Sequence, residues 1–361
     1  MNDLWSALAN SITPYVPGEQ PKNITNLVKL NTNENPYPPA PAVFDAIKEA
    51  ANEDLRLYPD CNASCMVDSL VRFYQAKHPA AKLDSSNFFI GNGSDEVLAF
   101  ALRAFYGQER PLNMNDITYS FYTVYCDLFD IPYVIHPLKD DFTIDVDSFA
   151  EAKGGVIITN PNAPTGIFLD IASIKRILDA HKKDVVIIDE AYIDFGGESC
   201  AGLLSEYDNL LIVTTLSKSR SLAGMRIGYA YGHKSLIEGL NVIKNSFNSY
   251  TMDRLAQAAG AAAIDNWEYY DIITDKIIED RTILCEKLAK MGFETLPSSA
   301  NFIFTTHPGY PAKELYEGLR RQGVIVRYFN KPRISEYLRI TIGDRAQNDR
   351  IVEALNKEFG L

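Results

Sequence analysis

The stretch VVIIDEAYIDF, residues 185–195, places two acids directly after four consecutive apolar residues. A continuous β-branched run of this kind predicts a strand that is covered on both faces, as in a parallel sheet. The acids would then lie at the carboxyl edge of the sheet, where open α/β sheets bind their ligands. Three interpretations stand at this point: the metal-binding acid of a nucleotide hydrolase, a cofactor partner in a transferase, or an ordinary turn.

The composition of the chain argues against several classes of protein. Its 361 residues are 46% apolar and 23% charged, which is ordinary for two domains or one elaborated domain. The net charge, 35 − 47 = −12, argues against a broad nucleic-acid interface. No stretch approaches the roughly 18 apolar residues of a membrane span, and the first residues, MNDLWSALANSI, lack the basic region of a secretory signal.

The cysteines and histidines form no recognisable framework. Five cysteines, an odd number, argue against a set of disulfides, and the five histidines lack the spacing of metal ligands. We therefore expect a cytoplasmic protein with no metal site, and with neither nucleic acid nor a membrane as its partner.

Strand and helix signals alternate through the middle of the chain, which predicts a parallel sheet with crossover helices. The segments in order are NFFIGN (87–92), GSDEVLAFALRAF (93–105), IPYVIHPL (131–138), GGVIITN (154–160), IASIKRILDAHKK (171–183), VVIIDEAY (185–192) and NLLIVTTL (209–216).

The two ends of the chain differ from this middle part. The first forty residues are rich in Asn and Pro, which predicts an extended arm with one short helix. After about Gly232 the helical patterns lengthen, and strand signals return in NFIFTT (301–306), GVIVRYF (323–329) and YLRITIG (337–343). We predict an α/β fold: an arm (1–40) packing on the small domain, a large domain (41–240) with a mostly parallel sheet flanked by helices, and a smaller α+β domain (241–361).

Residues with chemical potential follow several of the predicted strands. GNGSDE (91–96) opens a helix and suits an anion, although it lacks the third glycine of a dinucleotide fingerprint. NPNAPTG (160–166) is a rigid turn, and Lys218 stands just past a buried strand in TLSKSRSLAGMRIGY (215–229). Each has an ordinary structural interpretation as a turn or a solvated loop. Together, at one sheet edge, they indicate a site for a phosphorylated cofactor.

The motifs GNGSDE, TYSFY (118–122), NPNAPTG, DEAY (189–192) and TLSKSRSLAGMRIG, in this order, resemble the fold-type-I pyridoxal-phosphate aminotransferases, and among them the histidinol-phosphate aminotransferase family. The resemblance runs from residue 13 to residue 343, nearly the whole chain. It is highly specific for the cofactor and less specific for the substrate.

The resemblance implies roles around the cofactor ring. Lys218 would bond to the cofactor aldehyde and move the proton, and Asp189 would keep the ring nitrogen protonated so that the ring withdraws electrons. Tyr192 would hydrogen-bond the phenolate oxygen, and Tyr119 would stack on the ring. The family usually has Asn before Pro-Thr-Gly, where this chain has Ala163. Either Asn162 takes over the contact with the phenolate oxygen, or Tyr192 makes it alone.

The resemblance also implies a phosphate site, a subunit contact and a substrate clamp. The phosphate would be held by Ser217, Arg226 and the backbone N–H groups around Gly93, Ser94 and Asp95. Tyr58, in LRLYPD, would reach the phosphate from the second subunit of a homodimer. Arg327 and Arg339 would bind the anionic end of the substrate, with Tyr15 and Asn33 lining the same pocket.

The implied activity is amino transfer between histidinol phosphate and glutamate or 2-oxoglutarate. The alternatives are an aromatic or broad-specificity aminotransferase and a decarboxylase of a phosphorylated amino acid. A nucleotide hydrolase is disfavoured because no Gly-Lys-Ser/Thr occurs. A binding module without catalysis is disfavoured by the presence of both Lys218 and Asp189.

Overall fold

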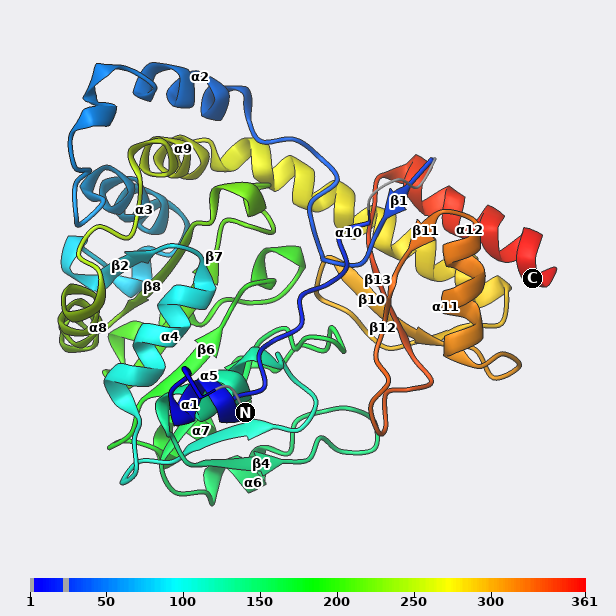
Figure 1. The fold of residues 1–361 in the computed structure, drawn as a ribbon, viewed down its shortest axis with the longest axis horizontal. Coiled ribbons are helices and arrows are strands. Elements are labelled where there is room, and N and C mark those ends of the chain that lie inside the picture. The colour runs from blue at the N-terminus through cyan, green and yellow to red at the C-terminus, as the bar shows by residue number, and fades with distance from the viewer. Residues whose placement is uncertain (1–2, 22–25) are drawn as a thin grey trace.

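The central sheet contains seven strands in the order β2-β8-β7-β6-β5-β3-β4 in the computed structural model, which describes residues 3–21 and 26–361 (Figure 1). The strands are β2 (Phe88–Gly91), β3 (Leu112–Asn115), β4 (Tyr133–His136), β5 (Gly155–Thr159), β6 (Val186–Asp189), β7 (Leu210–Thr215) and β8 (Gly228–Gly232). The pairs from β4 to β7 are parallel, whereas β8 runs antiparallel to both β2 and β7. The prediction of a mostly parallel sheet is confirmed, and strands β3 and β8 were not predicted.

Helices cover both faces of this sheet, as the predicted α/β architecture requires. On one face α4 (Ser94–Phe105), α5 (Phe121–Phe129) and α8 (Lys234–Phe247) pack with Ile187 of β6. On the other face, Ile188 belongs to a core shared with α3, α6, α7 and α9. These four helices are α3 (Ser64–Lys77), α6 (Val146–Ala150), α7 (Ile171–Ala180) and α9 (Arg254–Asp265). Since side chains alternate along a strand, Asp189 shares the face of Ile187 and Glu190 shares that of Ile188.

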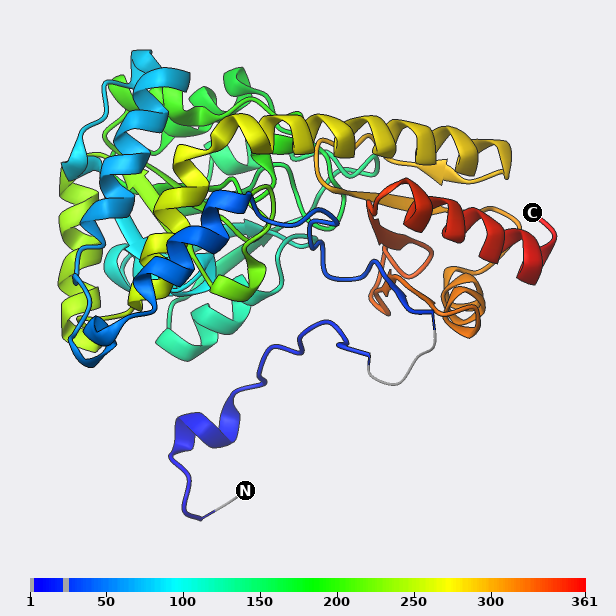
Figure 2. The same cartoon turned by 90° about the horizontal axis from the view of Figure 1, so that it is seen from above.

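A second, antiparallel sheet in the order β12-β13-β10-β9 forms the smaller part of the molecule. Its strands are β9 (Glu294–Thr295), β10 (Phe302–Thr306), β12 (Arg327–Tyr328) and β13 (Leu338–Thr341), and the helices beside it are α11 (Ala312–Arg321) and α12 (Arg345–Phe359). The long helix α10 (Trp267–Lys290) runs from the large part of the molecule into the small part (Figure 2). No described helix has the length and apolar character that a membrane span needs.

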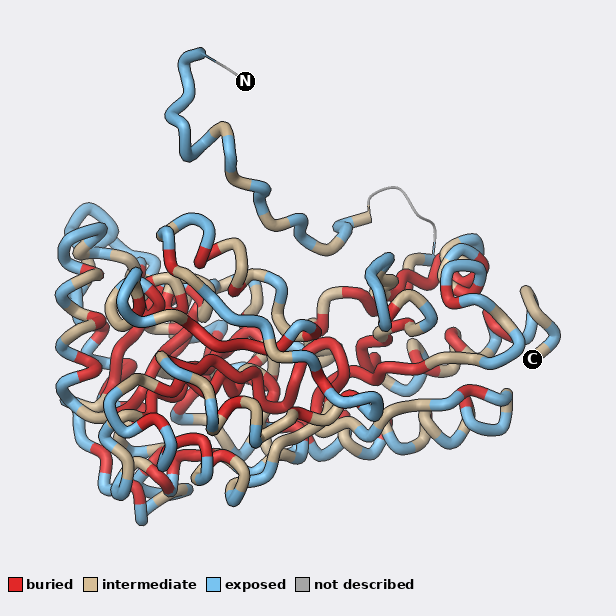
Figure 3. Tube along the Cα trace, turned by 90° about the horizontal axis from the view of Figure 1, so that it is seen from below, coloured by how far each residue is buried: buried red, intermediate tan, exposed pale blue. Residues whose placement is uncertain are grey.

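The N-terminal segment joins the small part through a short strand pair. Within it, β1 (Val28–Lys29) lies parallel to β11 (Val324–Ile325). The described residues before 22, which include α1 (Ala7–Ser11), are mostly exposed, and their first part extends away from the body of the molecule (Figure 3). Tyr15, by contrast, packs against Tyr119 and Phe121.

The predicted boundary at residue 240/241 does not coincide with a change in packing. It falls inside α8, and the following helix α9 packs against α3 and α2 (Pro41–Ala50) of the large part. We propose instead that α10 connects the two domains. On this proposal the predicted boundary comes too early in the chain, because the lengthening of the helical pattern precedes the point where the chain leaves the large sheet.

Strand β8 and the start of α4 approach so closely that only glycine fits at Gly228. A Cβ on Gly228 would lie 2.2 Å from the backbone nitrogen of Ser94 and 2.4 Å from the carbonyl carbon of Gly93. We predict that Gly228→Ala lowers the free energy of unfolding by about 1–3 kcal/mol, because backbone atoms have to shift. Urea unfolding checks this, with Gly202→Ala as the control, since no atom lies within 4 Å of a Cβ there. Equal losses in the two variants would contradict the packing described.

Candidate active site

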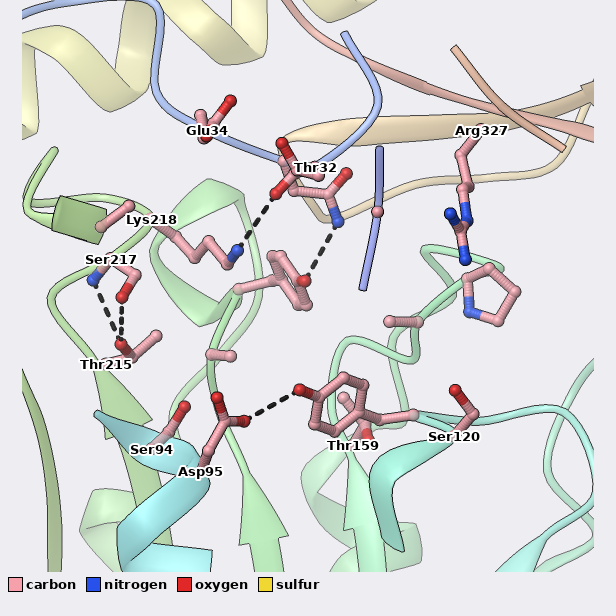
Figure 4. A pocket seen from close by; sticks show the side chains of 18 of the residues that line it. Thr32, Glu34, Ser94, Asp95, Ser120, Thr159, Thr215, Ser217, Lys218 and Arg327 are labelled. Atoms are coloured by element: carbon pink, nitrogen blue, oxygen red, sulfur yellow. Dashed lines mark hydrogen bonds between the residues drawn. The ribbon is translucent and has the colours of Figure 1, made fainter. Parts of the chain in front are cut away.

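A cavity of about 430 Å³ opens where β5, β6 and β7 end, a usual size for a small-molecule site. The arm, the large sheet and the small domain all contribute to its walls (Figure 4). The predicted site residues that line it are Tyr15, Asn33, Ser94, Asp95, Tyr119, Asp189, Tyr192, Ser217, Lys218, Arg226, Arg327 and Arg339. The structure thus brings together residues that are up to 324 positions apart, from 15 to 339.

Asp189 is a carboxylate that ends a buried strand, and only 3% of its surface is exposed. The hydroxyl of Tyr122 donates to Oδ2 at 2.7 Å, and the N–H of Ala191 donates to Oδ1 at 3.2 Å. The pKa of Asp189 is raised to about 6, mainly by burial and to a lesser degree by the charge of Asp95, although the hydrogen bonds from Tyr122 and Ala191 and the charge of Lys218 act in the opposite direction. A group in this setting favours a cationic ligand, because a cation would restore the charged form.

Lys218 enters the cavity from the loop that follows β7. Its Nζ donates a long hydrogen bond of 3.4 Å to the carbonyl oxygen of Thr32 and lies 5.7 Å from the centre of the Tyr192 ring. The backbone of this loop is fixed by Asn35, whose amide donates to the Lys218 carbonyl at 3.1 Å. Because an ammonium carries three donors, this amine remains available to a ligand. Its loop, by contrast, is held in place.

Tyr192 connects the large domain with the arm and the small domain. The amide of Asn33 donates to the Tyr192 hydroxyl oxygen at 3.0 Å, and Oδ1 of Asn33 accepts from the Thr341 hydroxyl at 3.1 Å. The Tyr192 ring packs edge-on against Phe302, with centroids 5.0 Å apart. Since the tyrosine oxygen accepts from Asn33, its own proton is free to be donated to a ligand in the cavity.

The start of α4 has the features of an anion site. Gly93 precedes the helix with φ +85°, and no side chain caps this end. A Cβ on Gly93 would lie 2.8 Å from Nη2 of Arg226, so the glycine makes room for the guanidinium. The Ser94 and Ser217 side chains lie on the same side of the cavity (Figure 4). Free N–H groups at a helix start, hydroxyls and a guanidinium together suit a phosphate.

Tyr119 is held in place by its own hydroxyl. It donates to Oδ1 of Asp95 at 2.8 Å, and Oδ2 of the same carboxylate pairs with Arg226 at 3.1 Å. Burial, followed by the negative charge of Asp95, raises the pKa of Tyr119, so the phenol stays protonated. The side chain of Asp95 therefore connects Tyr119 to Arg226 in the anion site, a role that the sequence did not suggest.

Two arginines of the small domain face the cavity without acidic partners. Arg339 donates from Nη2 to the carbonyl oxygen of Asn31 at 3.0 Å, whereas its buried Nε has no hydrogen-bond partner among the described residues. Burial lowers the pKa of Arg339. The guanidiniums of Arg327 and Arg339 both lie over the Phe329 ring, each 5.5 Å from its centre. Within the described part of the chain neither forms an ion pair, which favours an anionic ligand.

Asn162 does not reach the cavity. Its amide nitrogen donates to the carbonyl oxygen of Ile117 and to the hydroxyl of Thr165, both at 3.0 Å. These contacts contradict the predicted contact with a ring oxygen, because the amide donors are used by Ile117 and by Thr165 of the same turn. Ala163 and Pro164 line the cavity in its place.

Two tyrosines, Tyr58 and Tyr122, lie outside the group of predicted residues that line the cavity. Tyr58 is 79% exposed and does not line the cavity of its own chain. Tyr122, which the sequence analysis did not single out, makes the hydroxyl contact to Asp189. The signal for Tyr122 lies in TYSFY, where two tyrosines are three residues apart and could face the same side of a helix start.

Glu190 points to the opposite side of the sheet from Asp189. Its carboxylate accepts from the Ser199 hydroxyl at 2.7 Å and from the Cys200 N–H at 2.6 Å. Burial raises the pKa of Glu190 to about 7. The two neighbouring acids therefore differ in surroundings, and Asp189 is the one of this pair that faces the cavity. No group of three or more His, Cys, Asp or Glu within residues 3–21 and 26–361 could hold a metal ion.

The raised pKa of Asp189 leads to a pH-dependent prediction for the protein freed of small molecules. Between an ordinary pKa of 3.8 and the folded value of about 6, the folded state holds a proton that the unfolded state has lost. The free energy of unfolding therefore falls as the pH rises through this window, by about 3 kcal/mol in total. We predict that Asp189→Asn is more stable than the wild type above pH 7, and that its advantage shrinks by pH 5.

Thermal unfolding at the two pH values measures this difference. Asp68→Asn, at an exposed position on α3, is the control and should show no such advantage. If the wild type were more stable than Asp189→Asn above pH 7, Asp189 would not carry an uncompensated negative charge, and the prediction would be wrong.

Comparisons with known proteins place the chain in a family. The family described as aminotransferase class I and II matches residues 25–355. Histidinol-phosphate aminotransferase of Clostridium botulinum (strain 657 / Type Ba4) is 51% identical over 361 residues, which cover 99% of this chain and 100% of the relative. The solved histidinol-phosphate aminotransferase of Sinorhizobium meliloti, in complex with pyridoxal-5'-phosphate, superposes with a TM-score of 0.86 at 23% identity and covers 99% of this chain and 98% of that one.

The same fold occurs in proteins of other names. L-threonine-O-3-phosphate decarboxylase from Porphyromonas gingivalis superposes with a TM-score of 0.78 at 20% identity, covering 93% of this chain and 100% of that one. The fold alone therefore does not separate transfer from decarboxylation. The family match over most of the length and the relative at 51% identity do establish the family. This chain belongs to the aminotransferase class I and II family.

Proposed function

We propose that the chain is a histidinol-phosphate transaminase, which transfers an amino group between histidinol phosphate and 2-oxoglutarate in histidine biosynthesis, with pyridoxal phosphate as cofactor. The observation that carries this proposal is the distribution of charge in the cavity. A lysine and a buried carboxylate stand at the sheet edge, and two arginines without acidic partners face them from the small domain. The relatives at about 50% identity over the full length support the substrate.

The residues of the cavity fit pyridoxal phosphate group by group. The uncapped start of α4, with the space that Gly93 leaves beside Arg226, suits its phosphate. The buried carboxylate of Asp189 suits a protonated ring nitrogen, and the free proton of the Tyr192 hydroxyl suits the ring oxygen. The Lys218 amine suits the aldehyde. When bound, this cofactor supplies a sink for the electrons released at the carbon that carries the amino group.

The chain's own residues then have separable tasks. Asp189 keeps a proton on the ring nitrogen. The ion pair between this nitrogen and the carboxylate offsets the burial that raises the pKa of Asp189. Lys218 would take the proton from the substrate carbon that carries the amino group and would deliver it to the carbon that was the cofactor aldehyde. Tyr119, anchored by Asp95, limits the tilt of the ring from one side. The loop held by Asn35 keeps the Lys218 amine within reach.

The two arginines select the substrate. Histidinol phosphate carries a phosphate and no carboxylate, so its phosphate is the group that Arg327 and Arg339 bind. Glutamate presents carboxylates to the same two side chains in the other half-reaction. Both substrates therefore occupy one site in turn, which requires ping-pong kinetics. Tyr15 and Asn33 complete the pocket from the arm.

The proposal includes a homodimer and a cytoplasmic location. The exposed ring of Tyr58 supports the subunit contact, because it lies outside its own chain's cavity. In the dimer it would bind the cofactor phosphate of the partner subunit.

Replacement of Lys218 tests the cofactor assignment. The wild type should be yellow, and borohydride should fix the cofactor on the peptide that contains Lys218. We predict that Lys218→Ala binds the cofactor without becoming fixed, and that its kcat falls about 10²–10⁴-fold because the proton carrier is lost. Lys182→Ala, at an exposed position, is the control and should behave as the wild type. A fully active Lys218→Ala variant would remove the lysine from its role.

Substrate preference tests the assignment to histidinol phosphate. We predict that kcat/KM for histidinol phosphate exceeds that for phosphate-free histidinol about 10–100-fold, because a charge-assisted contact to half-buried arginines is lost. We also expect kcat/KM to be lower for phenylalanine than for histidinol phosphate. A preference for phenylalanine would favour an aromatic or broad-specificity aminotransferase, and release of carbon dioxide from a phosphorylated amino acid would favour a decarboxylase.

A further inference from the structure

Lys244 is a buried lysine that does not line the cavity. It lies in the last turn of α8, only 2% of its surface is exposed, and its Nζ donates to the carbonyl oxygen of Cys61 at 2.7 Å. No ion pair of Lys244 occurs among the described residues. Burial of an ammonium without a carboxylate is costly. The contact with Cys61 is therefore the feature that calls for an explanation.

Two side chains of α9 hold the same short segment, residues 57–61, and they also bind backbone carbonyls. Gln257, which is 5% exposed, donates to the carbonyl oxygen of Asp60 at 2.8 Å. Arg254 donates from Nη2 to the carbonyl oxygen of Tyr58 at 3.0 Å. Together with the Lys244 contact, three carbonyls in four successive residues are fixed from two helices.

The side chain of Tyr58, which this segment carries, is largely exposed. The Tyr58 ring stacks on the Tyr250 ring, with centroids 4.7 Å apart and 21° between their planes, yet Tyr58 is 79% exposed. A fixed backbone with an exposed phenol is the arrangement that presents a side chain to another molecule, because little conformational entropy is lost on binding.

We propose that Lys244, together with Gln257 and Arg254, is a positioning residue that presents Tyr58 to the cofactor phosphate of the partner subunit. The inference rests on the proposed function, in which Tyr58 acts across the dimer. It adds that a buried lysine in one subunit controls the active site of the other.

A competing explanation places the effect of Lys244 in its own chain. Glu96 lies near enough to Lys244 for their charges to interact, and its Oε2 accepts from the N–H of Asn92 at 2.6 Å, in the loop before α4. A change at Lys244 could therefore disturb the phosphate site of the same subunit. The two explanations predict opposite results in a dimer of two different chains.

The experiment uses hybrid dimers made from two differently tagged full-length chains loaded with cofactor. A Lys244→Met homodimer should lose about tenfold in kcat/KM for histidinol phosphate. In a hybrid of Lys244→Met with Lys218→Ala, the intact Lys218 belongs to the Lys244→Met chain, and its Tyr58 comes from the other chain, where Lys244 is intact. We expect this hybrid to reach the activity of one wild-type site. A hybrid site as weak as one in the Lys244→Met homodimer would overturn the proposal, because Lys244 would then act within its own chain.

Three further variants make the result decisive. Arg254→Met removes the hydrogen bond to the Tyr58 carbonyl and changes a half-buried residue. It takes the place of Lys244→Met if that variant fails to fold, and it should show the same recovery of activity in the hybrid with Lys218→Ala. Lys234→Met, exposed at the first residue of α8, is the matched control and should keep wild-type activity.

Tyr58→Phe paired with Lys218→Ala tests the sharing of Tyr58 itself. Recovery in this pair supports the proposal, and its absence beside an active wild type overturns the proposal while leaving the transaminase assignment intact. An inactive wild-type dimer would overturn both.

Discussion

Asp189 ends a strand whose other residues are fully buried, and its own side chain is almost as inaccessible. A carboxylate in that place has to hold a proton or face a cation, because burial disfavours its charged form. The hydrogen bonds from Tyr122 and Ala191 offset part of this cost, and they also fix the direction of the carboxylate. The other residues of the cavity surround this carboxylate. Lys218 comes from the loop that follows the neighbouring strand β7, and the uncapped helix α4 begins close by.

The site also depends on segments that are distant in the chain and meet only in the fold. Asn33 of the N-terminal segment, Tyr192 of the large domain and Thr341 of the small domain form one run of hydrogen bonds. The same segment supplies the carbonyl oxygens of Asn31 and Thr32, which accept from Arg339 and Lys218 respectively. The arm thus contacts both Arg339 and Lys218, which we propose as a substrate-binding residue and as the catalytic lysine.

The sequence could predict those parts of the fold that have a continuous local signal. Strand β6 is an unbroken apolar run, and the placement of Asp189 at its end follows from the period of a strand. Strand β3 reads LNMN, and its buried Asn113 is hydrogen-bonded to the carbonyls of Lys153 and Gly155, some 40 positions away. Strand β8 reads GYAYG, in which glycine is required by the close approach of α4. No local pattern reveals contacts of this kind.

The same limit applies to the site residues. The motifs named the loop that contains Asn162, but the direction of its amide depends on Ile117, which lies 45 positions earlier. Tyr122 was overlooked because its partner, Asp189, follows 67 positions later. Residue types at the ends of predicted strands could therefore be identified, whereas their hydrogen-bond partners could not.

In the proposed function, Asp189 holds a protonated ring nitrogen in the bound cofactor. The most direct test is the ¹⁵N NMR chemical shift of the ring nitrogen in the enzyme reconstituted with ¹⁵N-labelled pyridoxal phosphate, compared with the Asp189→Asn variant. We expect the shift of a protonated pyridinium in the wild type from pH 6 to pH 9, and the shift of a neutral pyridine in the variant. A neutral ring nitrogen in the wild type would show that Asp189 does not form an ion pair with it.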